Sequence, residues 1–399
     1  MNSKIVRIEG TVQNYAWGGK DYIPELLGIK KPGETCAEYW LGAHDNAPSR
    51  LSSDELLNEA IRSNVNLFLG ESVANKFGRL PYLFKVLDVN DMLSIQVHPT
   101  KAEAEKGFQK ENELGIDLKA KNRNYKDDNH KPEIMVALSE FWLLHGFLSE
   151  EKLLTLLNQT PELSHLSEVF QSEGYKGLYQ TVMEESAEQT NKVLRPLIDR
   201  VLPLYKAGSL EKASPDYWAA KAFNTFCPEG NLDKGIYSIY FFNIVKVNAG
   251  EAVFQDAGIP HAYMEGQNME LMANSDNVLR GGLTPKHVDV PELLKHVVFE
   301  ATEPNILKGE AVANGMERVY TSPAPDFELS KISVAKDQQY QLRSKTSEIF
   351  MIVDGEGTVF NELGSDQYQK GEAFFVPYGT EVNISSENEI VIYRASVPV

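Results

Sequence analysis

Residues 149–205 constrain the fold of this chain most strongly, because their apolar residues recur at helical spacing while the sequence on both sides alternates as strands do. The helical spacing is clearest in Leu194, Leu197, Ile198 and Val201. We expect Pro196 and Pro203 to kink or end the later helices. The simplest interpretation is a helical insert of roughly 80 to 90 residues within a β protein.

Strand-type patterning precedes the insert. From about residue 4 to residue 99, short apolar runs are separated by Gly, Pro and Asn. The clearest predicted strands are 5–8, 39–41 and 84–87. Two segments rich in good helix formers, 53–61 and 101–106, each follow a residue of capping type, and we predict short helices there.

Strand-type patterning returns after the insert and persists to the C-terminus. The first predicted strand of this part is 236–247, and a helical segment is predicted at 290–295. Clear strands follow at 348–353 and 390–393, and from about Tyr320 onward the pattern is almost entirely β. The chain is therefore predicted to be mainly β with a helical insert.

Two stretches of this later β material resemble each other. Residues 250–254 read GEAVF and precede Gly258, and residues 371–375 read GEAFF and precede Gly379, so the flanking glycines are eight apart in both. A strand bounded by glycine turns is a recurring unit of jelly rolls, and two related barrels are the simplest account. Because His261 in the first copy is replaced by Val382 in the second, any metal site is expected in the first barrel.

At 399 residues the chain is long enough for two or three domains. The predicted architecture is two jelly-roll β domains plus an inserted α-helical domain. The expected division is the first part of the metal-binding jelly roll at 1–147, the helical domain at 148–235, the second part of that jelly roll at 236–318, and a metal-free C-terminal jelly roll at 319–399.

The composition is that of an ordinary globular protein from a reducing compartment. Cys36 and Cys227 are the only cysteines, which excludes a disulfide framework. The net charge of −18 argues against binding to nucleic acid or acidic membranes, although a local cluster of basic residues would still hold a small anion. We recognise no signal peptide or membrane span and expect a cytoplasmic protein.

Three segments place polar groups in apolar surroundings, where burial is costly without a partner. They are SIQVHP at 94–99, HKPEI at 130–134 and GIPHAY at 258–263. Gln96 and His98 share one face of a predicted strand, and Glu133 and His261 complete a plausible set of nitrogen and oxygen ligands. Such a set suits Zn²⁺, or another divalent ion such as Mn²⁺, Fe²⁺ or Co²⁺. Any one of these residues alone is as plausibly a hydrogen-bonded or solvated side chain.

The segment 270–286 gathers polar residues among turn residues, including Glu270, Asp276, Arg280 and Lys286. Polar irregular segments on a β scaffold are frequent sites of function. The alternative is a solvated loop, but the apolar residues within the segment indicate that part of it is buried.

Seven motifs in a fixed order cover nearly the whole chain. They are YAWGG at 15–19, AEYWLGAH at 37–44, PYLFKVL at 81–87, LSIQVHP at 93–99, NHKPE at 129–133, GIPHAY at 258–263 and NSDNVLRGGLTPK at 274–286. Together they closely resemble the type I mannose-6-phosphate isomerases, also called phosphomannose isomerases. The last motif is the most specific.

The resemblance implies a zinc enzyme with a catalytic cupin-type jelly roll, an inserted helical domain and a second jelly roll. It implies one Zn²⁺ per chain, bound by Gln96, His98, Glu133 and His261, and an active-site role for Arg280. The implied reaction interconverts mannose 6-phosphate and fructose 6-phosphate through an enediol. A monomer acting on a phosphosugar is expected.

This reaction needs a base, a group that stabilises the enediolate and an anchor for the phosphate. The candidates for proton transfer are His130, Asp276, Glu270 and Lys286, and the sequence does not choose among them. We favour a pair of Asp276 and His130, because an imidazole beside a carboxylate can titrate near neutral pH. Glu270 is the next choice.

Positive charge for the phosphate or enediolate is expected from Arg280, Lys131 and Lys286. Further candidates for contact with the substrate are Trp17, Glu38, Lys85, Ser94 and Tyr263, with Lys85 and Ser94 expected on one pair of strands.

His145 stands near a position where the family commonly has a small residue or Cys, and we expect it to be structural. Tyr39 is bulkier than the usual Leu. Two other functions remain open. One is a cupin oxygenase with a two-His, one-carboxylate Fe²⁺ site, against which Gln96 counts as a fourth ligand. The other is a non-catalytic sugar-binding cupin.

Overall fold

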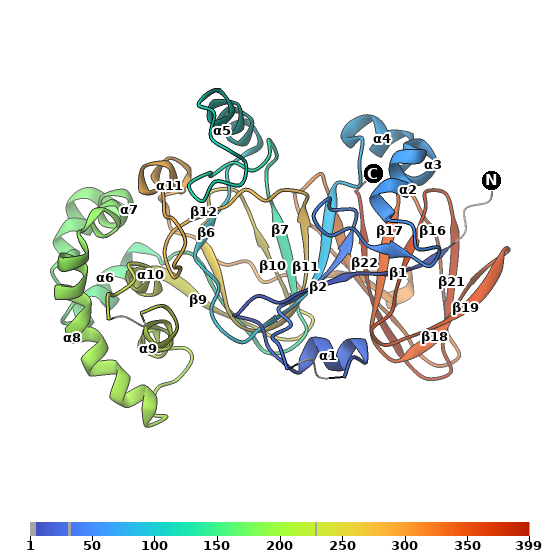
Figure 1. Cartoon of the computed structure of the whole chain (residues 1–399). Coiled ribbons are helices and arrows are strands. Elements are labelled where there is room, and N and C mark those ends of the chain that lie inside the picture. Colours follow the sequence, from blue (N-terminus) through green and yellow to red (C-terminus); the bar gives the residue numbers. More distant parts are fainter. Residues whose placement is uncertain (1–4, 31–32, 228–229, 399) are drawn as a thin grey trace.

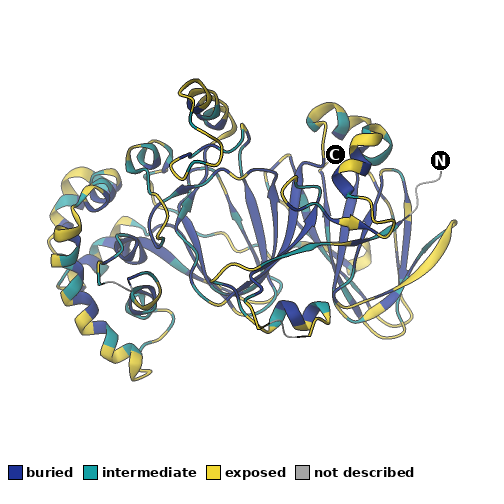
Figure 2. Ribbon diagram, viewed as in Figure 1, coloured by how far each residue is buried: buried dark blue, intermediate teal, exposed yellow. Residues whose placement is uncertain are grey.

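The computed structural model describes residues 5–30, 33–227 and 230–398. Two β barrels lie side by side, and a group of helices packs against the far side of the first barrel (Figure 1). The strands are largely buried, whereas the outward faces of the helices are exposed (Figure 2). The predicted fold of two jelly rolls with a helical insert is confirmed.

The first barrel has two layers of antiparallel strands. One layer has the order β10 (Ala252–Gln255), β7 (Glu133–Ala137), β11 (His261–Ala273), β5 (Tyr82–Val89), β3 (Glu38–Gly42) and β2 (Thr11–Gln13). The other has the order β12 (Leu279–Arg280), β6 (Gln96–Val97), the first part of β11, β8 (Phe141–Phe147) and β9 (Phe242–Val247). Strand β11 belongs to both layers, with a bulge between Tyr263 and Glu265. Such a bulge bends a strand and lets it change layer.

The second barrel is built mainly from the C-terminal part of the chain. Its larger sheet has the order β13 (Glu310–Val312), β14 (Glu317–Tyr320), β15 (Glu328–Val334), β22 (Ile390–Ser396), β17 (Glu348–Asp354), β20 (Ala373–Val376), β1 (Val6–Glu9) and β4 (Arg50–Leu51). Its smaller sheet has the order β16 (Gln339–Arg343), β21 (Glu381–Ser385), β18 (Glu356–Asn361) and β19 (Gly364–Gln369). The N-terminal strand β1 thus pairs with β20 of this barrel, and the four-part division of the chain stays a prediction.

The two larger sheets pack face to face through one shared apolar core. Side chains alternate along β5, so Tyr82, Phe84 and Val86 point into this core, together with Ile349 and Tyr393 of the second barrel. The opposite face of each sheet points into its own barrel. The polar residues of β5 and β11 that matter below lie on that inner face of the first barrel.

The predicted short helices are confirmed in one case and displaced in the other. Thr100 caps α5 (Lys101–Glu113) by accepting from the Glu103 N–H, and the helix extends beyond the predicted 101–106. The helix predicted at 53–61 begins later, as α2 (Leu57–Ser63). The remaining short helices are α1 (Tyr22–Leu27), α3 (Val65–Leu69), α4 (Glu71–Phe77), α11 (Val290–His296) and the 3₁₀ turn η1 (Ala313–Gly315).

The helical insert is confirmed as α6 (Glu150–Gln159), α7 (Leu166–Glu184), α8 (Ala187–Lys206) and α9 (Pro215–Phe226). Pro196 and Pro203 were expected to kink or end a helix, and helix α8 continues through both, so neither residue ends it. A proline inside a helix costs about 3 kcal/mol. Helix α8 tolerates both because its apolar face, which includes Leu194 and Leu197, is fully buried in the insert's core.

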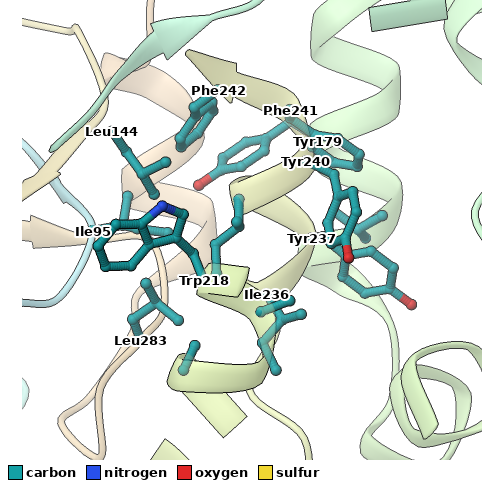
Figure 3. Packing of buried hydrophobic residues seen from close by; sticks show 14 of the residues in the cluster. Ile95, Leu144, Tyr179, Trp218, Ile236, Tyr237, Tyr240, Phe241, Phe242 and Leu283 are labelled. Atoms are coloured by element: carbon teal, nitrogen blue, oxygen red, sulfur yellow. The ribbon is translucent and has the colours of Figure 1, made fainter. Parts of the chain in front are cut away.

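The prediction of a strand at 236–247 is correct only for the second half of that segment. Its first part is the helix α10 (Gly235–Phe241), and only the second part is a strand, β9. Every residue of α10 is buried, so no polar face marks its helical period, and its aromatic and β-branched residues resemble those of a strand. Tyr237, Tyr240 and Phe241 pack in the same cluster as Trp218 of α9 (Figure 3). Tertiary packing, rather than a local sequence pattern, therefore makes this segment a helix.

No helix in the part of the chain that the structure describes is both long and apolar enough to cross a membrane. The two cysteines, Cys36 and Cys227, are buried and not joined by a disulfide.

A hydrogen bond ties the two barrels together at their shared core. The hydroxyl of Tyr82 is fully buried and lies 3.1 Å from the Ala395 carbonyl and 3.2 Å from the Ser347 carbonyl. Tyr82→Phe should lower the free energy of unfolding by about 1 kcal/mol, because a buried acceptor loses its donor. Urea unfolding would measure the change. Tyr378→Phe, at an exposed tyrosine, is the control and should be neutral.

Candidate metal centre and active site

Three side chains from distant parts of the chain converge inside the first barrel. His98 follows β6, Glu133 begins β7 and His261 begins β11. The Nε2 atom of His98 lies 3.4 Å from Glu133 Oε1, and the Nε2 atom of His261 lies 3.3 Å from Glu133 Oε2. All three are buried, and one ligand atom from each lies within 4.8 Å of the others. This is the spacing of groups that share one metal ion.

Backbone carbonyls orient both imidazoles. The Nδ1 atom of His98 lies 2.8 Å from the Asn277 carbonyl, and Nδ1 of His261 lies 2.9 Å from the Ile259 carbonyl. Each Nδ1 therefore carries the proton and donates, which leaves a lone pair on Nε2. Neither Nε2 has a hydrogen-bond partner among the described residues, although both are buried. Two orphaned acceptors aimed at one carboxylate fit a divalent cation between them.

The charge states of these groups also suit a metal. Burial lowers the pKa of His98 to about 4, so its imidazole is neutral at pH 7, as a ligand must be. Burial favours the protonated form of Glu133, but Lys131 and His98 outweigh it and hold its pKa well below the usual range. The ammonium of Lys131 lies 3.1 Å from Glu133 Oε1.

Gln96 lies beside this centre in a row of residues that crosses four strands. Arg280 pairs with Gln96, Gln96 pairs with His261, and His261 pairs with His145. Directly paired residues project from the same face of a sheet, so Gln96 and Arg280 share the face of His261. A role for Gln96 as the fourth ligand stays a proposal. His145 is outside the cluster, and its Nε2 lies 3.3 Å from the Phe254 carbonyl, which agrees with the expected structural role.

A buried polar network lies next to the metal centre on the inner face of the barrel. Lys85 Nζ lies 3.0 Å from Glu270 Oε2 and 3.6 Å from Glu38 Oε2. The Tyr263 hydroxyl donates to Glu270 Oε1 at 2.7 Å, and the Trp40 indole donates to Glu38. Burial lowers the pKa of Lys85, but the surrounding carboxylates raise it above its usual value, so Lys85 stays protonated. Burial raises the pKa of Glu270 in spite of Lys85.

The predicted pairing of His130 with Asp276 is wrong. His130 Nε2 lies 2.7 Å from Asp326 Oδ2, so the imidazole is directed at the segment that leads into β15. Asp276 instead lies 3.6 Å from His44 Nε2, and the Asn46 side chain donates to it at 3.1 Å. Burial raises the pKa of Asp276, but the contact with His44 lowers it below the usual value, so Asp276 is a carboxylate.

The sequence reading missed Tyr15 and His44. Burial and the carboxylates of Glu38 and Asp276 raise the pKa of Tyr15, whereas Lys85 lowers it. The ring of Tyr15 stacks on Trp17 with 5.9 Å between centroids. The sequence did contain an indication of both residues, because Tyr15 begins the motif YAWGG and His44 ends the motif AEYWLGAH.

Cationic groups surround the same region. Arg280 has a buried Nε without a hydrogen-bond partner in the described part of the chain, as a group awaiting an anion would have. Burial lowers the pKa of Lys286, and the positive charge of Arg280 lowers it further. Ser94 lies in the loop before β6, so the expected strand pair with Lys85 is not formed.

A cavity of about 850 Å³ opens beside His44 and Asp276. Its lining includes four basic residues, Arg62, Arg79, Lys119 and Lys126. The lining also includes three acidic residues, Asp45, Asp127 and Asp276, and Arg62 lies 2.5 Å from Asp45 Oδ1. The cavity is therefore of mixed charge, with only a small excess of basic residues.

The fold and the site together define a class: a double jelly-roll protein with a buried centre of two imidazoles and one carboxylate for a divalent metal. Residues 5–149 match the family described as phosphomannose isomerase type I, catalytic domain. The chain is 37% identical over 379 residues to the mannose-6-phosphate isomerase of Escherichia coli, covering 93% of this chain and 94% of the relative. It is 32% identical to mannose-6-phosphate isomerase 2 of Arabidopsis thaliana, covering 99% and 94%.

Solved structures agree. The mannose 6-phosphate isomerase of Salmonella typhimurium in its apo form superposes with a TM-score of 0.88 at 35% identity and covers 100% of both chains. The same TM-score and identity hold for that enzyme bound to substrate and a zinc atom, with 99% of this chain covered and 100% of the other. The chain belongs to the type I phosphomannose isomerase family.

Glu133 supplies the only negative charge of the three clustered residues, so its neutral isostere should lose the metal. Glu133→Gln is expected to lower metal affinity by about 10-fold or more, measured as metal content after dialysis against a weak chelator. The control is Glu113→Gln at an exposed site on α5. Equal metal content in both variants would contradict the placement of the metal.

Proposed function

We propose that this chain is a zinc-dependent aldose–ketose isomerase that interconverts mannose 6-phosphate and fructose 6-phosphate through an enediol intermediate. The observation that carries the proposal is the buried cluster of His98, Glu133 and His261, with two orphaned Nε2 atoms directed at one carboxylate. This cluster lies in a chain that belongs to a family of mannose-6-phosphate isomerases.

The donor set fits one Zn²⁺ per chain. Two imidazole nitrogens and a carboxylate oxygen suit a borderline cation, and Gln96, which pairs with His261 on the neighbouring strand, is the proposed source of an amide oxygen as fourth ligand. When bound, the ion acts as a Lewis acid that lowers the cost of negative charge on the sugar oxygens. The residues around it have to bind the phosphate, hold the substrate and move protons.

Arg280 and Lys286 are the proposed anchor for the phosphate. Arg280 offers a fork of N–H donors that matches phosphate oxygens, its buried Nε has no partner among the described residues, and Lys286 adds positive charge. Lys131, whose ammonium lies 3.1 Å from Glu133 Oε1, is proposed to contact the sugar oxygens nearest the metal. Trp17 and Ser94 are proposed as further contacts at the edge of the site.

Among the candidates for proton transfer, the environment favours Glu270. Its pKa is raised by burial, which makes its carboxylate a stronger base, whereas the pKa of Asp276 is lowered. Tyr263 and Lys85 hold the two oxygens of Glu270 in place. Glu38 then acts through Lys85, as a positioning residue. His130 loses its claim as the partner of Asp276 but stays a candidate.

The two other functions fit less well. An Fe²⁺ oxygenase would use the same two imidazoles and carboxylate. It would give Arg280, whose buried Nε has no partner among the described residues, no anion to bind. A non-catalytic sugar-binding cupin would have no need for a buried base beside the metal. We also propose that the protein is a cytoplasmic monomer, in line with its reduced cysteines.

Arg280→Ala should lower turnover by about 100-fold while the zinc content stays at one per chain, because the guanidinium binds the substrate rather than the metal. A coupled isomerase assay and elemental analysis of the same preparation would measure both. Arg318→Ala, at an exposed arginine of the second barrel, is the control. Loss of zinc in the Arg280 variant would contradict this placement.

The decisive experiment removes the metal from the whole protein. Chelator-treated protein should not convert mannose 6-phosphate, and Zn²⁺ added back should restore conversion. Full activity of the metal-free protein, or no conversion with any added metal, would refute the proposal. Oxygen consumption with Fe²⁺ would favour the oxygenase instead.

A further inference from the structure

The two barrels correspond strand by strand. In chain order, β3, β5, β6, β7, β8, β9 and β10 match β14 to β20, and the two halves of β11 match β21 and β22. The larger sheets have the same neighbours, because the order β10-β7-β11-β5-β3-β2 corresponds to β20-β17-β22-β15-β14-β13. The helical insert lies between β8 and β9, where the second barrel has the tight hairpin between β18 and β19.

The register of pairing is also the same. In the first barrel Ala252 pairs with Val136 and Gln255 with Glu133. In the second barrel Ala373 pairs with Met351 and Val376 with Glu348. The two similar stretches found in the sequence are thus β10 and β20, and Glu348 occupies the position of Glu133.

The other members of the metal centre are replaced. His261 pairs with Gln96 in the first barrel, and Val382 pairs with Leu342 in the second. Ser344, two residues after Leu342, occupies the position that corresponds to His98, and its hydroxyl donates to the Pro377 carbonyl. One carboxylate is therefore retained at a fully buried position without the imidazoles that accompany it in the first barrel.

An arginine meets this carboxylate. Arg394 pairs with Phe350 as Glu270 pairs with Met135, so it stands where the first barrel has Glu270. Its Nε lies 2.6 Å from Glu348 Oε2 and its Nη2 lies 2.9 Å from Glu348 Oε1, which is a bidentate pair.

The third nitrogen of the Arg394 guanidinium also has a partner. Its Nη1 lies 2.8 Å from Glu317 Oε1, and Glu317 occupies the position of Glu38. Ser330 and Tyr340 donate to the two oxygens of Glu317 at 2.6 Å each. Every oxygen of both carboxylates therefore has a donor, so the centre is closed.

We propose that the C-terminal barrel is a second copy of the metal-binding barrel in which the guanidinium of Arg394 supplies the positive charge that the metal supplies to Glu133. The retained carboxylate is the structural centre of that barrel. A buried carboxylate without a counter-charge is strongly destabilising, so the loss of the ligands and the presence of Arg394 belong together.

The test first removes the positive charge of Arg394 and then also removes the negative charges of Glu317 and Glu348. Arg394→Met, which keeps most of the side-chain volume, should lower the melting temperature of the full chain by roughly 10 °C or more. The triple variant Arg394→Met, Glu317→Gln, Glu348→Gln should recover at least half of that loss, because no buried carboxylate is left unpaired. Thermal unfolding followed by circular dichroism measures both.

The matched control is Arg343→Met, at an exposed arginine of the same barrel, and it should leave the melting temperature unchanged. If Arg394→Met gives no folded protein, recovery of folded protein in the triple variant supports the proposal. An unchanged melting temperature for Arg394→Met, or a triple variant no more stable than the single one, overturns it.

Discussion

A carboxylate buried inside a β barrel needs a cation or several donors beside it, and both barrels of this protein are organised around that requirement. Glu133 faces two imidazoles whose protons are held on the far nitrogen by backbone carbonyls, so the near nitrogens are free to accept a metal. Glu348 faces Arg394. Desolvation of an unpaired carboxylate costs several kcal/mol, which fixes the identity of the neighbours in each barrel.

Strand β11 brings the chemistry of the first barrel together. It begins with His261 at the metal centre, bends at its bulge and continues along the other layer to Glu270. One strand therefore carries both the proposed metal ligand and the proposed base. Lys85 and Tyr263 hold Glu270 from neighbouring positions, so the base does not depend on a flexible loop for its orientation.

Sequence patterning predicted the elements that have one buried and one exposed side, or that follow a clear cap. The helical insert and the helix after Thr100 are examples. Sequence patterning failed for α10, because this helix is buried on every side and its sequence shows no alternation of polar and apolar residues at helical spacing. It also gave no indication that β1, at the start of the chain, would pair with β20 near its end, because strand partners distant in sequence leave no local signal.

The sequence by itself determined which types of metal-binding side chain are present and their order along the chain. It also determined that the second barrel has Val382 where the first barrel has His261. Only the tertiary structure decided which charged or polar side chains meet. Asp276 lies beside His44 rather than His130, and Glu348 pairs with Arg394. These pairs join residues from 46 to 232 positions apart. Strand register and side-chain direction bring such residues together, and neither is written in the local sequence.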